Sequence, residues 1–399
     1  MIADLVLGLV VLSTGYQLFS LCCAFLFARW RRRELASPCA PDAELPPVTL
    51  LKPLRGVVPE TWETLSEVCR LDYPKLQILF GVAEPSDPAA ALVRRLKQEN
   101  PDADIELVFS GDVVGTNAKV SNLHGMLKRA KHDVLVIADA DIRAPRDYLR
   151  RIVPYLGHPN AGLVTCNYRA VEGKSLASRL EALFVNTDFG PMVTVARLVE
   201  QQSYAFGATI CIRRATLESI GGFAAVGDHL ADDYQIGNRV VQQGRVSVLA
   251  PVIVETVLDL EHLSEVFRHQ LRWARTYRVC RPWSYLASFA VTHTTLWGLL
   301  YFALSGATLG GALACGAAIG VRLLVGATVA SRVLGVPGIA RRLWLMPVKD
   351  LLVSLVCVLA YLGNRVRWGG NEFVVHSDGK MYPTEEPADR RVATPRPAA

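Results

Sequence analysis

The sequence predicts a membrane-anchored α/β protein in which a mostly parallel β-sheet domain lies between apolar segments. Three observations lead to this fold class. Strand-like and helix-like segments alternate between residues 48 and 166, and the blocks Leu5–Ala28 and Pro282–Val321 contain no Asp, Glu, Lys or Arg. In addition, 51% of the 399 residues are hydrophobic and the mean hydropathy is +0.25. Together these properties exclude disordered, fibrous, disulfide-scaffold and fully soluble proteins.

The first apolar block predicts an uncleaved transmembrane anchor at residues 1–29. Leu5–Ala28 is long enough to cross a bilayer, which takes about 20 apolar residues, and no small-residue cleavage site follows it. Arg29 and the run Arg31–Arg33 come directly after the block. The positive-inside rule therefore places the N terminus outside and the following chain in the cytosol. Residues 30–47, which end in a Pro-rich run, are expected to be a linker.

Residues 48–263 are expected to form the α/β domain. The predicted strands are Val48–Leu51, Gln77–Val82, Ile105–Phe109, Val134–Ala138 and Gly162–Cys166, and the predicted helices between them are Pro59–Leu71, Ala89–Glu99 and Lys119–Lys131. This alternation is typical of a mostly parallel sheet that is covered by helices on both sides. Ligands of such sheets bind at the carboxyl ends of the strands, so candidate site residues are sought there.

Aspartates follow two of the predicted strands. Asp87 comes after Gln77–Val82, and Asp139 and Asp141 come after Val134–Ala138. Two carboxylates at i and i+2 are suited to Mg²⁺ or Mn²⁺, which prefer oxygen ligands and bridge to substrate phosphates. The structural alternative is that either aspartate forms a turn or caps a helix.

Four further residues are candidates on weaker grounds. Asp232 is expected to cap a helix at Asp233–Gln243, which leaves Asp233 as a candidate general base. Lys119, in GTNAKVSNL, is expected in the turn before a helix, either binding an anion or free on the surface. Gly207, in YAFGAT, fits either a close approach of the backbone or simple turn chemistry.

Residues 264–282 predict an amphipathic helix at the membrane surface. One face carries the apolar residues Phe267, Leu271 and Ala274, and another face carries Arg268, Arg272 and Arg275. Arginines on such a helix would meet lipid phosphates. The pair Arg272-Trp273 is also suited to a diphosphate beside a flat or lipidic partner, and both roles are compatible with one helix.

The C-terminal membrane region, residues 283–363, is expected to contain two or three further spans. The block 283–321 accommodates two helices that turn near Ser305–Gly306. Leu351–Gly363 is so short that a span, a re-entrant segment and an interfacial segment are all compatible with it. A complete crossing there would place the arginines that follow outside, against the positive-inside rule. Three and four spans in total are both compatible with the sequence.

The remaining features exclude other classes of protein. The net charge is +6, and no basic stripe with interleaved aromatic residues is found, so no nucleic-acid partner is expected. The nine cysteines form no Cys-x-x-Cys pair, which argues against zinc and fits a reducing compartment. Residues 364–399 are expected to be a tail whose Pro-rich end, from Pro383, is disordered.

Taken together, the motifs of the chain resemble those of the ceramide glucosyltransferase family. From Val48 to Trp273 they occur in the order LLKPLRG, LDYP, SDPA, NAKVSNL, IADADIR, FGAT-x-C-x-RR, GGF, ADDY and RHQLRW. Members of this family are membrane glycosyltransferases with a cytosolic GT-A domain, related to cellulose, chitin and hyaluronan synthases. The resemblance implies this fold, a UDP-sugar donor and a lipid acceptor.

The resemblance also implies roles for individual residues on the donor side. Asp87 is expected at the uridine end of the donor, and Lys119 is expected to be a nucleotide-side basic residue. Asp139 is expected near the diphosphate and the metal, Mg²⁺ or Mn²⁺, with Asp141 completing a DxD motif. Asp233 is expected to be the catalytic base.

On the acceptor side, Arg272 and Trp273 match an Arg-Trp motif that is expected to bind the diphosphate and border the acceptor channel. His269 stands where relatives have Gln or Arg, so a polar group is kept there and is predicted to bind substrate. The stretch Asn186–Pro191 departs from the animal ceramide enzymes. A hopanoid is therefore an alternative acceptor to ceramide.

The predicted function is the inverting transfer of a sugar, glucose first of all, from a UDP-sugar to a lipid hydroxyl. The protein is expected in the bacterial inner membrane with its catalytic domain in the cytosol. The alternatives are a hopanoid glycosyltransferase that uses UDP-N-acetylglucosamine, a processive polysaccharide synthase and a non-catalytic membrane scaffold. The small number of spans argues against the synthase, and the complete set of acidic residues argues against the scaffold.

Overall fold

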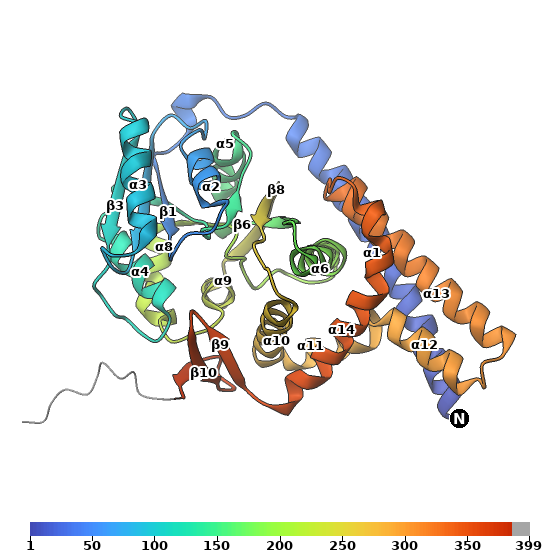
Figure 1. The fold of residues 1–399 in the computed structure, drawn as a ribbon. Coiled ribbons are helices and arrows are strands. Elements are labelled where there is room, and N and C mark those ends of the chain that lie inside the picture. Colours follow the sequence, from blue (N-terminus) through green and yellow to red (C-terminus); the bar gives the residue numbers. More distant parts are fainter. Residues whose placement is uncertain (385–399) are drawn as a thin grey trace, which may run out of the picture.

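The structure, a computed structural model, describes residues 1–384 and joins a sheet domain to a group of apolar helices (Figure 1). The central sheet has eight strands in the order β3-β2-β1-β4-β7-β6-β8-β5. They are β1 (Val48–Pro53), β2 (Leu76–Val82), β3 (Asp104–Phe109), β4 (Val134–Ile137), β5 (Ile142–Arg143), β6 (Ala161–Val171), β7 (Ile210–Arg213) and β8 (Val246–Val257).

The mostly parallel sheet predicted from the sequence is confirmed. Strands β3, β2, β1 and β4 are parallel neighbours, and β6 is parallel to β8. Strand β7 is antiparallel to both β4 and β6, and the short β5 is antiparallel to β8. All five predicted strands are present.

Helices cover both faces of the sheet, as the alternating pattern predicts. They are α2 (Thr61–Val68), α3 (Pro88–Glu99), α4 (Ala118–Leu127), α5 (Tyr148–Ile152), α8 (Arg214–Ser219) and α9 (Asp232–Gln242). Apolar side chains of α2, α3 and α5 pack in one core with Leu50 and Phe80. Those of α4, α8 and α9 pack in a second core with Leu51 and Leu79. Adjacent strand residues thus face opposite cores.

Between β6 and β7 the chain forms a helical excursion that reaches the membrane helices. It consists of α6 (Leu176–Phe184), a π-helical turn (Val185–Phe189) and α7 (Gly190–Val199). Short 3₁₀ turns occur at Asp42–Glu44, Val153–Gly157 and Phe223–Val226. The excursion follows the end of β6, which brings its residues beside the edge of the sheet where ligands are expected.

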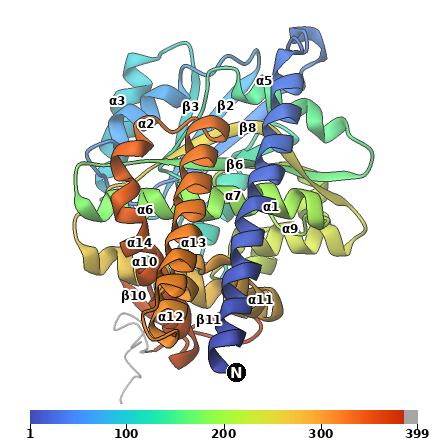
Figure 2. The same cartoon turned by 90° about the vertical axis from the view of Figure 1, so that its right-hand side faces the viewer.

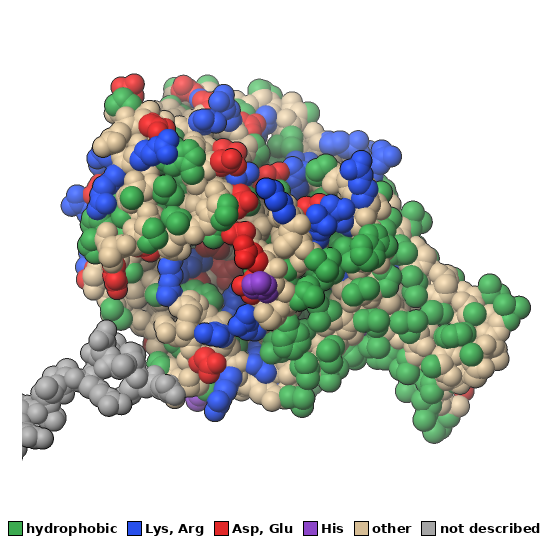
Figure 3. All heavy atoms as spheres, viewed as in Figure 1, with side chains coloured by type: hydrophobic (Ala, Val, Ile, Leu, Met, Phe, Trp, Pro, Cys, Tyr) green, Lys and Arg blue, Asp and Glu red, His purple; other side chains and the backbone are tan. Residues whose placement is uncertain are grey.

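The amphipathic helix α10 and a group of apolar helices pack beside the sheet domain. They are α1 (Ile2–Ala36), α10 (Leu263–Cys280), α11 (Pro282–Thr292), α12 (Thr294–Leu304), α13 (Leu309–Thr328) and α14 (Met346–Leu359). Helix α13 continues in a π-helical turn (Val329–Val333), and α14 lies between 3₁₀ turns at Ile339–Leu345 and Ala360–Leu362. Helices α1, α13 and α14 run along one face of the molecule (Figure 2), and hydrophobic side chains cover this region (Figure 3).

Within residues 1–384, three helical segments are long and apolar enough to cross a membrane: Ile2–Ala36, Leu309–Val333 and Ile339–Leu362. Helices α11 and α12 pass the same criteria only as a pair, and the pair is bent by 56°. The last segment is longer than the uncharged stretch Leu351–Gly363 considered in the sequence. Lys349 and Asp350 do not end it, because both side chains are buried within the protein.

These two residues belong to a buried charge cluster, which consists of Asp188, Arg322, Lys349 and Asp350. Arg322 of α13 bonds to Asp188 at 2.8 Å and to Asp350 at 3.1 Å. Lys349 of α14 pairs with Asp350 at 2.6 Å and also with Asp188, which lies in the π-helical turn. Two acids and two bases therefore neutralise each other between α13, α14 and the excursion from the sheet domain.

After α14 the chain returns to the sheet domain, which the sequence did not predict. A three-stranded antiparallel sheet is formed by β9 (Arg365–Trp368), β10 (Asn371–Val375) and β11 (Met381–Pro383), and it is called the tail sheet below. Disorder was expected from Pro383 onward. This is wrong for Pro383 itself, which pairs with Phe373 in the tail sheet. Residues 385–399, the rest of that segment, lie outside the described residues.

Candidate active site

A cavity of about 1160 Å³ opens at the carboxyl ends of β1, β2 and β4. Its lining contains the residues after these strands, residues of α6, α7 and α10, and side chains of α11 and α14. On the surface, acidic side chains gather along a hollow that lies between the sheet domain and the hydrophobic region (Figure 3). All eight residues predicted to bind substrate or metal or to act as the base line this cavity: Asp87, Lys119, Asp139, Asp141, Asp233, His269, Arg272 and Trp273.

The part of the cavity at the sheet edge has at its centre an ammonium group held between carboxylates. Lys119 Nζ lies 2.7 Å from Asp139 Oδ1 and 3.0 Å from Asp232 Oδ2. Burial lowers the pKa of Lys119, but the charges of Asp139, Asp232 and Asp233 outweigh this effect and raise the pKa above its usual range. Lys119 therefore carries a positive charge into the cavity. It lies in the first turn of α4, whose N-terminus is capped by Asn117, and not in the turn before the helix.

Asp232 does not cap its helix, which corrects the prediction from the sequence. Helix α9 begins at Asp232 itself, Ala231 occupies the N-cap position, and no side chain caps the helix. The carboxylate of Asp232 pairs instead with Lys119, and the side chain is almost fully buried. A buried charge that is paired in this way costs less free energy than an unpaired one. The side chain of Asp232 therefore forms an ion pair with Lys119 and does not cap the helix.

A glycine allows the acids to approach one another. A Cβ atom at Gly207 would lie 2.4 Å from Asp139 Oδ2 and 3.3 Å from Lys119 Nζ. The backbone N–H of Gly207 donates a hydrogen bond of 2.8 Å to Asp233 Oδ2, and its carbonyl accepts one of 3.1 Å from the N–H of Asp139. Of the two roles considered for Gly207, the structure therefore has the close approach.

A buried lysine that the sequence analysis did not select supports the Asp139–Asp141 turn. Lys52 of β1 is 1% exposed and donates to the carbonyl oxygens of Asp139 at 2.8 Å and Ile142 at 2.9 Å. Burial lowers the pKa of Lys52 to about 8. A lone lysine in the apolar strand VTLLKP was the signal available in the sequence, because a buried lysine needs several acceptors.

Asp139 and Asp141 together provide oxygen atoms for a divalent cation. Burial raises the pKa of Asp139 to about 6, against the opposing charge of Lys119. Asp141 is exposed, and its Oδ2 accepts a hydrogen bond of 2.5 Å from Thr256, so its other oxygen is free. Residues 1–384 contain no cluster of three or more acidic, His or Cys side chains that would hold a metal alone. The pair nevertheless fits Mg²⁺ or Mn²⁺ whose remaining ligands are phosphate oxygens and water.

Asp87 has a structural role as well as a place in the cavity wall. Its Oδ1 accepts from the N–H of Ala89 at 2.9 Å and so caps α3. Both of its oxygens also accept from the N–H of Gly56, at 3.0 and 2.9 Å. Asp87 thereby joins the end of β1 to the start of α3. It follows β2, which is separated from β4 by β1 in the sheet, so it lies on the side of the cavity away from β4.

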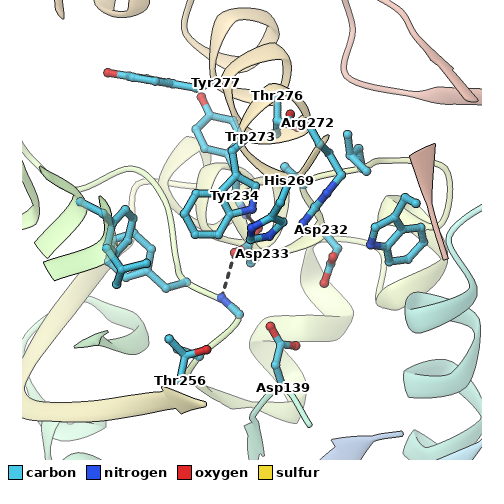
Figure 4. Close-up of a pocket in the computed structure, with 18 of the residues that line it drawn as sticks. Asp139, Asp232, Asp233, Tyr234, Thr256, His269, Arg272, Trp273, Thr276 and Tyr277 are labelled. Atoms are coloured by element: carbon cyan, nitrogen blue, oxygen red, sulfur yellow. Dashed lines mark hydrogen bonds between the residues drawn. The ribbon is translucent and has the colours of Figure 1, made fainter. Parts of the chain in front are cut away.

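Asp233 faces the cavity from the first turn of α9. Its Oδ1 accepts from the N–H of Tyr234 at 2.7 Å and its Oδ2 from Gly207. Burial and the adjacent charge of Asp232 raise the pKa of Asp233. Figure 4 shows Asp233 between Asp139 on one side and the side chains of α10 on the other. A carboxylate of raised pKa in this position is suited to proton abstraction.

Helix α10 brings three predicted residues to the same place. His269, Arg272 and Trp273 point from α10 toward Asp232 and Asp233 (Figure 4). Within residues 1–384, the Arg272 guanidinium has neither a hydrogen-bond acceptor nor a carboxylate within 4 Å. Burial lowers the pKa of Arg272, and the charges of Glu181 and Asp233 oppose this effect. Arg272 is thus a cation available to an anionic ligand.

His269 is held by a buried glutamate that the sequence analysis missed. Glu181 of α6 is fully buried, with Oε1 2.6 Å from His269 Nδ1 and Oε2 accepting from Gln270 at 2.8 Å. A carboxylate at Nδ1 fixes the proton on that nitrogen and leaves Nε2 as an acceptor. The ring of His269 also lies against Trp273, with centroids 4.7 Å apart. Glu181 carried no signal in the sequence, because its partners are 88 and 89 residues away.

The arginines of α10 do not share one role, which differs from the predicted basic face. Arg268 is exposed and bonds within its own helix to Ser264. Arg272 enters the cavity. Arg275 donates to the carbonyl of Arg365, and Arg278 contacts Asn364. Arg272 and Arg275 were expected to meet lipid phosphates, but Arg272 lines the cavity and Arg275 contacts the tail sheet.

The second half of the cavity is lined by helices. Phe189 lies between Tyr168 and Phe206, with ring centroids 4.5 and 5.2 Å away, and Trp273 packs on Phe184. Beyond these rings the lining continues along α7, α11 and α14 through Met192, Val193, Ala196, Tyr285, Ser288, Thr292, Val353, Val356 and Cys357. The cavity therefore extends from the carboxylates to the helices that are apolar enough for a membrane.

The sequence profile of glycosyl transferase family 21 matches residues 6–381. The chain belongs to glycosyl transferase family 21. Its match to a solved structure, the mannosyltransferase PcManGT from Pyrobaculum calidifontis in complex with GDP-Man and Mn²⁺, has a TM-score of 0.52 at 20% identity. The match covers 89% of this chain and 99% of that chain. The predicted GT-A-like glycosyltransferase fold is thereby confirmed.

The family 21 chain is also similar to curated proteins, and the predicted resemblance to ceramide glucosyltransferases is confirmed. It is 24% identical to ceramide glucosyltransferase 3 of Caenorhabditis elegans over 210 residues. These residues cover 52% of this chain and 46% of that protein. It is 32% identical over 118 residues to the Candida albicans ceramide glucosyltransferase, 27% and 22% of the two chains. A β-monoglucosyldiacylglycerol synthase of Synechocystis is 23% identical over 201 residues, 48% and 40% of the two chains. The matches thus span less than half of each relative's length.

Proposed function

We propose that this family 21 protein is a membrane-bound, inverting glycosyltransferase that moves a sugar from a UDP-sugar to the hydroxyl of a lipid. The observation that carries the proposal is the continuity of the cavity, which joins the carboxylates of the sheet edge to the apolar helices. A water-soluble donor and a lipid acceptor can meet there without the lipid leaving the membrane. The names of the similar proteins, ceramide glucosyltransferase and β-monoglucosyldiacylglycerol synthase, support a sugar donor and a lipid acceptor.

In the reaction, Asp233 removes the proton from the acceptor hydroxyl. The hydroxyl oxygen forms a bond to the anomeric carbon while the bond from that carbon to the β-phosphate oxygen breaks, and UDP leaves. A single displacement inverts the configuration, so an α-linked donor gives a β-glycoside. The raised pKa of Asp233 makes it a stronger base than an ordinary aspartate, provided that it is deprotonated.

The charge that develops on the leaving diphosphate is offset by two cations of the protein. Within residues 1–384 the Arg272 guanidinium has no carboxylate partner, and Lys119 is held by Asp139 and Asp232. Cations fixed in a buried site stabilise such charge without reorganisation. Bound Mg²⁺ or Mn²⁺ at Asp139 and Asp141 would neutralise further phosphate charge. Chelation by EDTA is expected to abolish transfer and either ion to restore it, and full activity in EDTA would contradict the metal site.

The Glu181–His269 pair is proposed to orient the acceptor. Because Glu181 holds the proton on Nδ1, the Nε2 atom of His269 accepts a hydrogen bond from a hydroxyl of the lipid. The aromatic group of Tyr168, Phe189 and Trp273 then covers the apolar part next to that hydroxyl. Ceramide and hopanoids both combine hydroxyls with an apolar body, so both are candidate acceptors, and glucose is the first candidate sugar.

The arrangement in the membrane follows from the return of the chain to the sheet domain after α14. If α1 spans with its N terminus outside, the sheet domain is cytosolic, and the tail sheet that bonds to it is cytosolic too. The chain between Pro282 and Leu362 must then cross an even number of times. The N terminus and the α12–α13 turn lie at the same end of the molecule (Figures 1 and 2). We therefore assign crossings to α1, the bent pair α11–α12 and α13, and an incomplete insertion to α14.

Lipid labelling tests the function. Membranes from bacteria that overexpress the chain are supplied separately with radiolabelled UDP-glucose, UDP-galactose or UDP-N-acetylglucosamine, and with ceramide or a polyhydroxylated hopanoid. The label is expected in extractable lipid as a product of one added sugar, and membranes with Asp233→Asn serve as the control. A ladder of masses would indicate a polysaccharide synthase instead. The absence of transfer from any donor to any lipid would contradict the proposal.

A further inference from the structure

The tail sheet closes one wall of the cavity. Trp368, Gly369 and Asn371, at the tight turn between β9 and β10, line the cavity together with Leu54 and Arg55 from the end of β1. The turn has two glycines with positive φ, Gly369 at 57° and Gly370 at 84°, which suits a two-residue hairpin. More than 300 residues of sequence separate β1 from this turn, yet the two form one surface.

The turn lies directly on an arginine. A Cβ atom at Gly369 would be 2.4 Å from Arg55 Nη1, and one at Gly370 would be 3.9 Å from Arg55 Nη2. The turn therefore lies against the guanidinium of the exposed Arg55, and any larger residue at Gly369 would displace that group. Arg55 precedes Gly56, whose N–H bonds to Asp87, so the turn sits over the segment that joins β1 to α3.

The tail sheet is fixed in this position by contacts on its other edges. Met381 N–H donates to the carbonyl of Asp228 at 2.7 Å, and Thr116 Oγ1 donates to the carbonyl of Met381 at 3.2 Å. Phe373, Val375 and Met381 are at most 5% exposed and pack on Leu230. These contacts hold the loops that lead to Lys119 and Asp232, so the tail sheet is part of the structure that presents the site.

We propose that the tail sheet completes the donor site and that Trp368 stacks on the uracil base of the bound nucleotide. The inference rests on the proposed function, because it takes the donor to be a UDP-sugar. A half-buried indole that lines a cavity beside an arginine and an N-cap aspartate offers a flat apolar surface at the edge of a polar pocket. Base–aromatic stacking of this kind contributes substantially to nucleotide binding. Trp368 precedes Gly369, which lies against Arg55, and it packs in the same cluster as Val279 of α10.

The experiment measures binding of UDP and UDP-glucose by calorimetry to the full chain in detergent. Trp368→Ala is expected to weaken both ligands by about tenfold, and Trp368→Phe to restore most of the affinity. Tyr382→Ala is the matched control, because Tyr382 is an exposed aromatic residue of β11 that does not line the cavity, and its affinity should equal that of the wild type. The melting temperature of each variant shows that it is folded.

If the wild-type protein binds both ligands, three outcomes would overturn the inference. Unchanged affinity of Trp368→Ala for both ligands would show that the tail sheet does not contact the donor. Weakened binding of UDP-glucose with unchanged binding of UDP would place the contact on the sugar. If Trp368→Phe bound as weakly as Trp368→Ala, stacking would not be its basis. A wild-type protein that bound neither ligand would instead contradict the proposed UDP-sugar donor, and the inference with it.

Discussion

The two halves of the cavity are built on different principles. The donor half consists of charged residues placed at strand ends, such as Asp87 and Asp139, and its positions are fixed by the backbone of the sheet. The acceptor half consists of aromatic and aliphatic side chains from helices that meet only in the tertiary structure, such as Phe189 on the excursion and Val353 on α14. The proposed reaction site is therefore positioned by the sheet, while the surface proposed to select the lipid depends on how the helices pack. Changes in the first half should affect the reaction, and changes in the second should affect the choice of acceptor.

The largest effect is expected for Asp233→Asn. Loss of the general base should lower kcat by about 10³-fold, while the affinity for the UDP-sugar stays within about twofold because the amide keeps the shape of the side chain. Asp133→Asn, at a highly exposed aspartate on the surface, is the control and should leave kcat unchanged. Single-turnover transfer and donor binding are the measurements. Equal losses of binding and transfer would contradict the assignment of the base.

The next largest effect tests the close packing of the donor half. Gly207→Ala introduces a Cβ atom 2.4 Å from Asp139 Oδ2, so the carboxylate must move. A displacement of about 1 Å at a reacting centre is expected to lower kcat/KM for the donor by about 10²-fold. Gly157→Ala, where no atom lies within 4 Å of the new Cβ, should be neutral. Wild-type rates for Gly207→Ala would show that the close approach is not needed.

A third change is aimed at the acceptor half alone. Val353→Trp would fill the part of the cavity beside α14, and it is expected to raise the KM for the lipid by about tenfold while the KM for the UDP-sugar stays unchanged. Val358→Trp, on the exposed side of the same helix, should have no effect. Transfer measured at varied lipid and varied donor separates the two constants. A rise in both would mean that the halves are not independent.

The smallest expected effect is a shift of the pH profile. Burial, followed by the charge of Asp232, raises the pKa of Asp233, and Asp233 must be deprotonated to act. Transfer should therefore fall as the pH decreases through a value above the ordinary 3.8 of aspartate. Asp232→Asn removes one of the charges and should move this acid limb to lower pH. An acid limb that does not move in Asp232→Asn would show that another group titrates.

The sequence predicts well which residues lie at the sheet edge of the cavity, and the physical reason is local. A strand followed by an aspartate places that aspartate at the sheet edge whatever the rest of the chain does, so Asp87 and Asp139 were found from pattern alone. Arg272 and Trp273 were selected by their motif, and the structure adds that they face Asp233 (Figure 4). Lys52 and Glu181 were missed because their functions depend on partners that are distant in sequence. The tail sheet was missed for the same reason, since its strands are short and its core is shared with Leu230.

The buried charge cluster has a consequence for how the protein is made. During synthesis, Arg322 emerges before Lys349 and Asp350, and after Asp188 has been placed in the excursion of the sheet domain. An unpaired charge is costly in a membrane segment, and Asp188 is the only acid of the cluster that has been synthesised when α13 enters the bilayer. Helix α13 is thus expected to dock on the sheet domain through Asp188, and α14 to add its contacts to Asp188 afterwards. We therefore expect the apolar helices to assemble after the sheet domain has folded, so a chain whose sheet domain fails to fold would leave α13 unanchored and open to proteolysis.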